Sequence, residues 1–113
     1  RSLISRGIET NNRQSGSLCD AILTPAPGQI TFPIMARLCG PGMVVTDDEA
    51  LPAMMLAWDR LKVVAEPGGA VALAAALFHG HQIEGEDVIV TISGGNVDAG
   101  VFAKALGRFG GQT

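Results

Sequence analysis

The chain has 113 residues, of which 47% are hydrophobic and 17% charged, a composition typical of one compact domain. A chain of this length buries roughly two-thirds of its unfolded surface, so a core can form without disulfide bonds or a structural metal ion. Eleven acidic residues against eight basic ones give a net charge of -3, which argues against nucleic acid as a partner. The longest nearly uncharged stretch, residues 70–81, is too short to span a membrane, and we expect a cytoplasmic protein.

The first part of the chain combines a helix end with a polar loop. Residues 1–6 predict the last turn of a helix with Gly7 at its C-cap, and residues 10–16 have loop composition. We therefore assign residues 1–16 to this helix end and loop, and residues 17–113 to the body of the same domain. No Met precedes Arg1, and we interpret the chain as a fragment of a longer protein.

Two helices are predicted in the middle of the chain. Residues 31–38 have helical spacing, with Thr31 as N-cap, and a short β-prone run follows at residues 43–45. Thr46 and Glu49 then form a capping box, which predicts a helix running to about residue 62. Pro52 lies beyond the first turn of that helix and is expected to bend or loosen it.

The second half of the chain predicts an α/β unit. Residues 70–78 have almost no polar face, which indicates a buried helix. The continuous β-branched run at residues 87–92 is typical of a strand covered on both faces, and residues 97–106 return to helical spacing. We therefore expect an α/β fold with a parallel or mixed sheet flanked by helices.

The turn after this predicted strand is the first candidate site. It consists of Ser93, Gly94, Gly95 and Asn96. Ligands of open parallel sheets bind beyond the carboxyl ends of the strands, where glycines allow close backbone approach and a hydroxyl and an amide can hydrogen-bond a ligand. The alternative is that a tight exit from strand to helix simply requires glycine.

The second candidate is Glu66, which stands before Pro67, Gly68 and Gly69 at the start of the apolar helix. A carboxylate in this position can be partly desolvated and exchange a proton with a substrate. Alternatively, it only compensates the positive end of the helix dipole.

Other reactive side chains do not form a recognisable catalytic set. His79 and His81 lack a third ligand nearby in sequence, so we expect no metal site and interpret them as helix-end residues. The acids at residues 47–49 are explained by helix capping. Cys19 and Cys39 are interpreted as buried apolar thiols, and neither Lys62 nor Lys104 has the surroundings of a Schiff-base lysine.

Five blocks of residues, in this order, resemble the carboxy-terminal part of threonine and serine dehydratases. These enzymes are fold-type II pyridoxal-phosphate enzymes, a group that also includes serine racemase and hydroxyaspartate ammonia-lyase. The resemblance covers nearly the whole chain from Ser17 onward, and the blocks are residues 17–21, 27–28, 45–49, 62–70 and 93–98.

The resemblance implies that the chain is the C-terminal part of the large cofactor-binding domain. It implies that the Ser93 hydroxyl faces the pyridine nitrogen of pyridoxal phosphate, that Gly94, Gly95 and Asn96 shape that edge of the pocket, and that Glu66 comes near it. A hydroxyl does not hold the ring nitrogen protonated, so the ring is a weaker electron sink, and rapid loss of a β-hydroxyl is favoured.

The reaction implied is dehydration of threonine, serine or 3-hydroxyaspartate, followed by release of ammonia and a 2-oxo acid; racemisation stays open. In the family, the Schiff-base lysine, the phosphate loop and the ligands of any divalent cation belong to the N-terminal half of the enzyme, which would precede Arg1. The chain by itself is therefore expected to be inactive, and the whole enzyme to be a homo-oligomer. Ala21 and Gly68 stand where the family often has glycine and serine.

Two further hypotheses come from other functional classes. The two glycine turns could hold a small anion in a non-catalytic binding module. The apolar residues 70–78 could instead be buried against a second copy of the chain in a self-associating structural domain.

Overall fold

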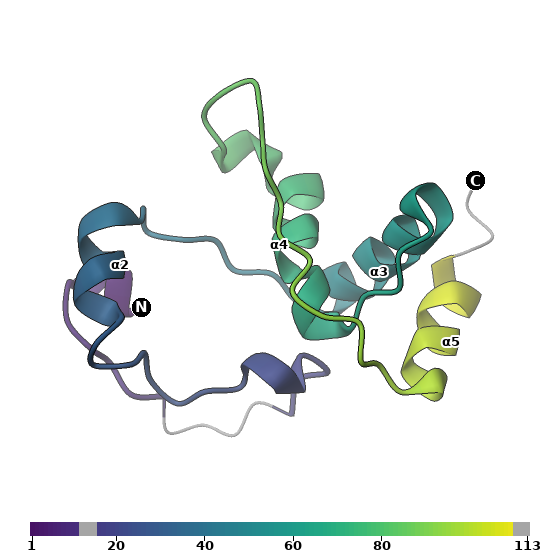
Figure 1. The fold of residues 1–113 in the computed structure, drawn as a ribbon, viewed down its shortest axis with the longest axis horizontal. Coiled ribbons are helices and arrows are strands. Elements are labelled where there is room, and N and C mark those ends of the chain that lie inside the picture. Colours follow the sequence, from purple (N-terminus) through teal and green to yellow (C-terminus); the bar gives the residue numbers. More distant parts are fainter. Residues whose placement is uncertain (12–15, 110–113) are drawn as a thin grey trace.

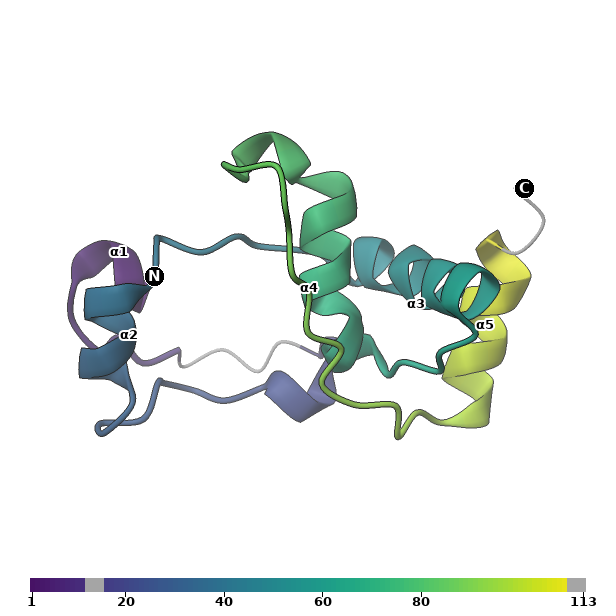
Figure 2. The same cartoon turned by 45° about the horizontal axis from the view of Figure 1, so that its top comes forward.

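The computed structural model describes residues 1–11 and 16–109, and within them all regular secondary structure is helical. Figure 1 shows α3, α4 and α5 gathered into one body. α1 and α2 lie apart from this body in both Figure 1 and Figure 2. In chain order the elements are α1 (Ser2–Ser5), the short 3-10 helix η1 (Asp20–Ile22), α2 (Phe32–Leu38), α3 (Asp47–Leu61), α4 (Pro67–Phe78), the short 3-10 helix η2 (Gly80–Gln82) and α5 (Ala99–Phe109).

The hydrophobic core lies where α3 packs against α4 and α5. Most of its residues are alanines, whose small side chains let the helix backbones approach closely. Trp58 of α3 meets Phe102 of α5 edge to face, with ring centroids 5.9 Å apart. The buried cluster consists of Leu51, Ala53, Met54, Ala65, Ala70, Ala74 and Ala105.

α3 begins as the capping box predicts. The Glu49 carboxylate accepts a hydrogen bond from the Thr46 backbone amide at 2.7 Å and another from the Thr46 hydroxyl at 3.1 Å. The helix then continues to Leu61, so Pro52 does not end it. Lys62 follows as C-cap in the left-handed conformation, with φ 57°.

α4 begins at Pro67, earlier than the predicted residue 70, because the fixed φ of proline suits the first turn of a helix. Ala70, Ala74 and Ala75 are buried, but Leu77 and Phe78 are exposed. The prediction of a helix buried all round is therefore wrong, because Ala72 in the middle of α4 is also exposed and the described elements cover only one side of the helix. The helix ends at Phe78, one residue before its C-cap His79.

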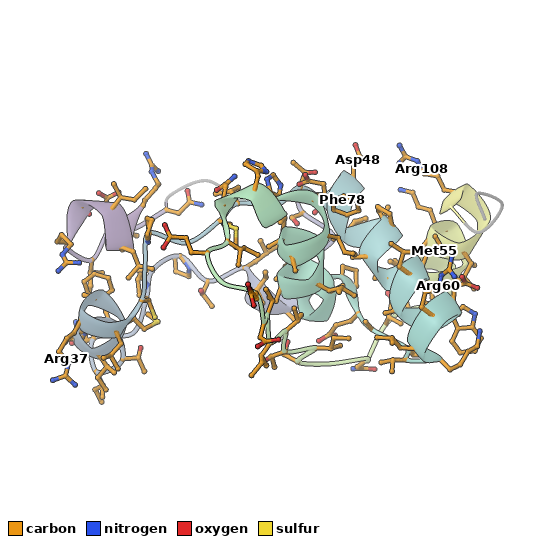
Figure 3. The ribbon with its side chains drawn as sticks, turned by 90° about the horizontal axis from the view of Figure 1, so that it is seen from above. Arg37, Asp48, Met55, Arg60, Phe78 and Arg108 are labelled. Carbon is orange, nitrogen blue, oxygen red and sulfur yellow. The ribbon has the colours of Figure 1, made fainter. Side chains whose placement is uncertain are left out.

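α5 packs on α3 and covers residues 99–109, slightly later than the predicted 97–106. Near its end, Arg108 donates a hydrogen bond from Nη1 to Oδ1 of Asp48 at 2.9 Å, and Figure 3 shows these two side chains approaching each other from the two helices. None of the described helices combines the length and the apolar character that crossing a bilayer requires.

The sheet predicted from residues 87–92 is not formed within the described residues. These residues run as an extended trace in front of α4 (Figure 1), without strand pairing. A strand needs a ladder of backbone hydrogen bonds to at least one neighbour, and the described chain supplies a single bond, at Gly94, whose carbonyl accepts the Glu66 amide at 3.0 Å. Segment 62–66, α4 and segment 87–96 thus have the order of a β-α-β unit, joined by a single backbone hydrogen bond.

The N-terminal part contains α1, α2 and the chain between them. α1 ends with Arg6 in the left-handed conformation at φ 63°, so the prediction of Gly7 as C-cap is wrong by one residue. α2 is confirmed with Thr31 as N-cap, although the Thr31 hydroxyl donates to the Gly28 carbonyl at 3.4 Å instead of capping the helix. Of the predicted loop at residues 10–16, residues 12–15 lie outside the described part.

Candidate functional site

The two turns singled out in the sequence meet in the structure. The Glu66 backbone amide donates to the Gly94 carbonyl at 3.0 Å, which brings the start of α4 against the turn after the extended segment. One residue further, the Val97 amide donates to the Gly95 carbonyl at 3.0 Å and closes the turn before α5. Two segments separated by the whole of α4 therefore form one surface.

Three glycines make this contact sterically possible. A Cβ built on Gly69 would lie 2.9 Å from the Gly94 backbone nitrogen and still closer to its carbonyl oxygen. A Cβ on Gly94 would overlap the Glu66 carboxylate, and one on Gly95 would overlap the Val64 carbonyl oxygen. The described chain itself occupies this space, so packing of the two turns requires these glycines. The sequence analysis offered two other reasons for Gly94 and Gly95, close approach of a ligand and a tight exit from strand to helix.

Three polar side chains lie on the joined turns. Ser93 and Asn96 are exposed, and neither side chain forms a hydrogen bond to any described residue. Glu66 is half-buried and is the N-cap residue of α4, and its side chain makes no capping hydrogen bond. A hydroxyl, an amide and a carboxylate are thus grouped within one small region and can hydrogen-bond a polar ligand.

The loop at residues 17–21, one of the blocks that carry the family resemblance, supports this region through a contact that the sequence analysis did not predict. Asp47 accepts hydrogen bonds from the Ser17 hydroxyl at 2.6 Å and the Leu18 amide at 2.9 Å. These bonds, the Ser17 bond foremost, lower the pKa of Asp47 below its ordinary value. The loop leads into η1, where a Cβ on Gly68 would lie 3.5 Å from Ile22, an ordinary contact. The sequence did not reveal this role of Asp47, because helix capping already explained the acids at residues 47–49.

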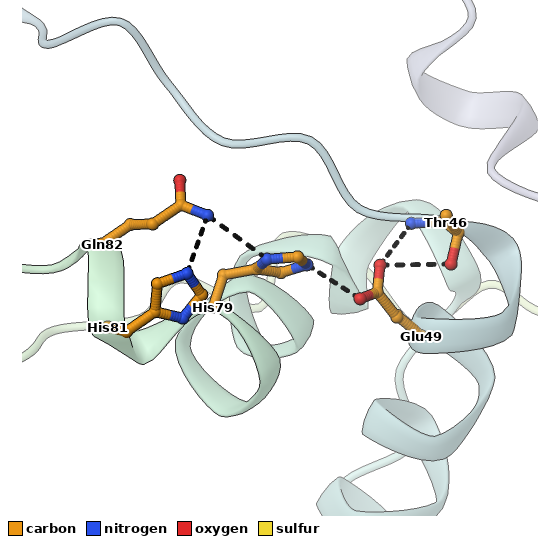
Figure 4. A network of polar contacts seen from close by, with 5 residues as sticks. All are labelled: Thr46, Glu49, His79, His81 and Gln82. Atoms are coloured by element: carbon orange, nitrogen blue, oxygen red, sulfur yellow. Dashed lines mark hydrogen bonds and ion pairs between the residues drawn. The ribbon is translucent and has the colours of Figure 1, made fainter.

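The histidines are helix-end residues, as predicted, but one has a specific partner. His79 Nε2 lies 2.8 Å from Glu49 Oε1, linking the end of α4 to the start of α3, and Gln82 Nε2 lies 3.5 Å from His79 Nδ1 (Figure 4). The hydrogen bond from the Thr46 backbone is the main cause that lowers the pKa of Glu49. Within residues 1–11 and 16–109, no three His, Cys, Asp or Glu side chains gather as metal ligands would.

The cysteines and lysines lie outside the joined turns. Cys19 is buried, and burial raises the pKa of its thiol; Cys39 is exposed, so the prediction of a buried thiol is wrong there. Lys62 donates from Nζ to the Asp59 carbonyl at 2.7 Å on the surface, and Lys104 is also exposed.

The comparisons with known proteins show the family of this chain. A family model described as pyridoxal-phosphate dependent enzyme matches residues 2–95. Serine racemase of Dictyostelium discoideum is 38% identical over 109 residues, covering 94% of this chain and 33% of the racemase. L-threonine ammonia-lyase of Thermotoga maritima is 32% identical over 105 residues, covering 93% of this chain and 26% of the lyase.

A solved structure shows the same arrangement in space. The crystal structure of a T.th. threonine deaminase superposes with a TM-score of 0.80 at 34% identity, covering 87% of this chain and 33% of the deaminase. This similarity agrees with the predicted α/β class, although the sheet is not seen within the described residues. The chain spans about a third or less of the length of these relatives. The resemblance found in the sequence is confirmed, and the chain belongs to the family of pyridoxal-phosphate dependent enzymes.

Proposed function

We propose that this chain is the C-terminal part of the cofactor-binding domain of a pyridoxal-phosphate dependent lyase. The lyase removes water from a β-hydroxy amino acid, threonine, serine or 3-hydroxyaspartate, and releases ammonia and a 2-oxo acid. The observation that carries the proposal is the meeting of the Glu66 and Ser93 turns, because it gathers exposed polar side chains at one place in a chain of this family.

The donor set fits one edge of pyridoxal phosphate. The exposed Ser93 hydroxyl has a free donor and acceptor, which matches a pyridine nitrogen, and Asn96 offers an amide beside it. When bound, the cofactor supplies an electron-accepting ring. A hydrogen bond from Ser93 orients the ring nitrogen without giving it a proton. Glu66 holds the Gly94 turn in place through its backbone amide and, through its side chain, fills the space beside it.

The complete reaction needs groups that this chain does not offer. Its two lysines are both exposed. We propose that the lysine that binds the cofactor, its phosphate-binding loop and the ligands of any divalent cation are supplied by the remaining part of a family-length protein, which assembles as a homo-oligomer in the cytoplasm. Alone, the 113-residue chain should release no 2-oxo acid.

Racemisation is a second candidate, because the Dictyostelium relative named serine racemase is similar over almost the whole chain. Racemisation requires return of the proton to the opposite face of the same carbon, while dehydration requires loss of the β-hydroxyl. The two are separated by incubating serine and measuring D-serine and pyruvate in the same sample.

The proposal is tested in a chimera in which this chain replaces the matching segment of the Thermotoga L-threonine ammonia-lyase. We compare Ser93→Ala with Thr91→Ala, which removes another exposed hydroxyl two positions earlier. Loss of one hydrogen bond to the ring should weaken cofactor retention by up to about tenfold in the Ser93 variant only. Equal retention and equal 2-oxo acid release in both variants would rule out the assigned role of Ser93.

The isolated chain gives the complementary test. Mixed with pyridoxal phosphate, it should develop no absorbance band of a lysine adduct. A band that disappears on substitution of Lys62 or Lys104 by Ala would show that this chain carries the reactive lysine itself, contrary to the proposal.

A further inference from the structure

The end of α4 and the short helix η2 bring two histidines and a glutamine together. His79 is the C-cap of α4, while His81 and Gln82 belong to η2. The Gln82 amide nitrogen lies 3.5 Å from His79 Nδ1 and 3.4 Å from His81 Nε2 (Figure 4). One side-chain amide therefore stands between a ring nitrogen of each histidine.

Glu49 decides which nitrogen of His79 is available to a ligand. Its carboxylate lies 2.8 Å from His79 Nε2. The hydrogen bond from the Thr46 backbone lowers the pKa of Glu49, so the carboxylate is ionised at neutral pH and only accepts hydrogen bonds. His79 Nε2 therefore carries the proton, and Nδ1 of the neutral ring keeps its lone pair. A histidine that binds a metal ion donates its other N–H to a carboxylate in the same way.

The spacing of the three side chains matches that of ligands around a tetrahedral metal ion. Ligand atoms about 2.1 Å from a zinc ion lie about 3.4 Å from one another in this geometry. The Gln82 amide lies at this distance from both rings, and a half-turn of the amide replaces its nitrogen by Oε1, which can bind a metal. The ring centroids are 6.2 Å apart, and the exposed His81 ring can move towards His79 to close the site.

We propose that His79 Nδ1, His81 Nε2 and Gln82 Oε1 bind one divalent transition-metal ion of the Zn²⁺ class, with water as the fourth ligand. Imidazole nitrogens suit Zn²⁺, Ni²⁺ and Cu²⁺, whereas Mg²⁺ and Ca²⁺ prefer oxygen ligands. The sequence analysis expected no metal site here, because it looked for a third His or Cys. The third ligand is an amide, which agrees with the absence of three clustered His, Cys, Asp or Glu side chains among residues 1–11 and 16–109.

A bound ion would connect three elements of the body. It would join η2 to the end of α4, and the contact between His79 and Glu49 would extend this connection to the capping box of α3. α4 has 12 residues and is about 18 Å long, so the site lies at the opposite end of this helix from the Glu66 and Ser93 turns. The inference therefore goes beyond the proposed function and does not depend on it.

Calorimetric titration of the 113-residue chain, without an affinity tag, with Zn²⁺ tests the site. We expect one ion per chain, and an unfolding temperature that rises with Zn²⁺ but not with Mg²⁺. His81→Ala removes an exposed ligand, so zinc binding should weaken more than about tenfold while unfolding without metal stays unchanged. Equal zinc affinity in the parent and in His81→Ala would overturn the proposal. The same pair in the chimera with the Thermotoga ammonia-lyase repeats the test in a family-length protein.

The orienting carboxylate and the amide are tested with matched controls. Glu49→Gln keeps a capping-box side chain but loses the charge, and zinc affinity should fall by about tenfold. The exposed Glu84→Gln should leave it unchanged. Gln82→Ala should weaken binding severalfold, while the exposed Gln29→Ala should not. Equal losses in the controls would show unspecific surface binding and contradict the site.

Cobalt distinguishes the histidines from the cysteines. Cys39 is exposed, and a thiolate is also a zinc ligand. Co²⁺ bound by ring nitrogens and oxygens should give visible bands without a charge-transfer band of a thiolate. A thiolate band, or loss of binding in Cys39→Ser, would place the ion at a cysteine and refute the proposal. The absence of any zinc binding by the parent chain and the chimera would refute it as well.

Discussion

The body of α3, α4 and α5 and the N-terminal part with α1 and α2 use apolar residues in opposite ways. In the body, Leu51 is 1% exposed and sits in a cluster of alanines, while in the N-terminal part Leu38 is 70% exposed. Both leucines lie on helices with helical spacing of apolar residues. The difference teaches that periodicity creates an apolar stripe, but only a packed neighbour converts that stripe into stability.

The largest expected effect comes from the same truncation in the two regions. Leu51→Ala should lower the free energy of unfolding by about 3–4 kcal/mol, because it leaves a cavity in the core. Leu38→Ala should change it by less than about 0.5 kcal/mol, because little surface is buried there. Urea unfolding followed by the fluorescence of Trp58 measures both, and equal losses would erase the distinction between the regions.

A smaller effect is expected at the glycine contact between the two turns. Gly69→Ala should destabilise by about 2–3 kcal/mol, because the added Cβ meets the backbone of Gly94, which cannot rotate away. The control is Gly107→Ala, at a helical position with open space around it, which should stabilise by about 0.5–1 kcal/mol. A neutral Gly69→Ala would show that the turns do not touch as described.

The link between the Ser17 loop and α3 should depend on pH. The pKa of Asp47 is lower in the folded state than in the unfolded state, so its contribution is present above its unfolded pKa and is lost as pH falls through the folded pKa. Asp47→Asn should cost about 1–2 kcal/mol at neutral pH and less in acid. The neighbouring Asp48→Asn, which breaks an exposed ion pair with Arg108 and removes one acid from the first turn of α3, should cost less than about 1 kcal/mol. The measurement is the free energy of unfolding as a function of pH. Parallel profiles for both variants and the parent chain would contradict the assigned role of Asp47.

The smallest expected effect comes from replacing two residues that have a left-handed backbone conformation, one in each region. Lys62→Gly should stabilise the body by about 0.5–1 kcal/mol, because glycine adopts φ 57° without the Cβ penalty. Arg6→Gly, at φ 63°, should leave the Trp58 transition unchanged because α1 does not pack on the body. A matching shift from Arg6→Gly would mean that the two regions unfold as one unit.

Local signals in the sequence predicted much of the helical framework. Thr46 and Glu49 marked the start of α3 because a capping box is satisfied within one turn. The start of α4 was placed late, because the turn residues Pro67 to Gly69 resemble a loop until tertiary packing buries them. The Asp47 contact with Ser17 spans 30 positions, and no local pattern encodes such a distance.

The candidate site was likewise predictable from the sequence only in part. The glycines and the polar residues at Glu66 and at residues 93–96 were chosen from strand-turn-helix order and from the family resemblance. Their steric reason was not predictable, because the Cβ clash of Gly69 with Gly94 arises only when two segments on either side of α4 fold together. The uncovered last turn of α4 likewise depends on which elements surround it.

By itself, the sequence determined the starts of α2 and α3, the order of the turns and membership in the family of pyridoxal-phosphate dependent enzymes, because capping residues act within a few positions and motifs keep their order along the chain. The tertiary structure alone decided that the Glu66 and Ser93 turns share one surface, that Asp47 holds the Ser17 loop, and that residues 87–92 pair with no other described segment. These depend on which distant atoms exclude one another and which backbone groups find partners, and both are properties of the folded chain.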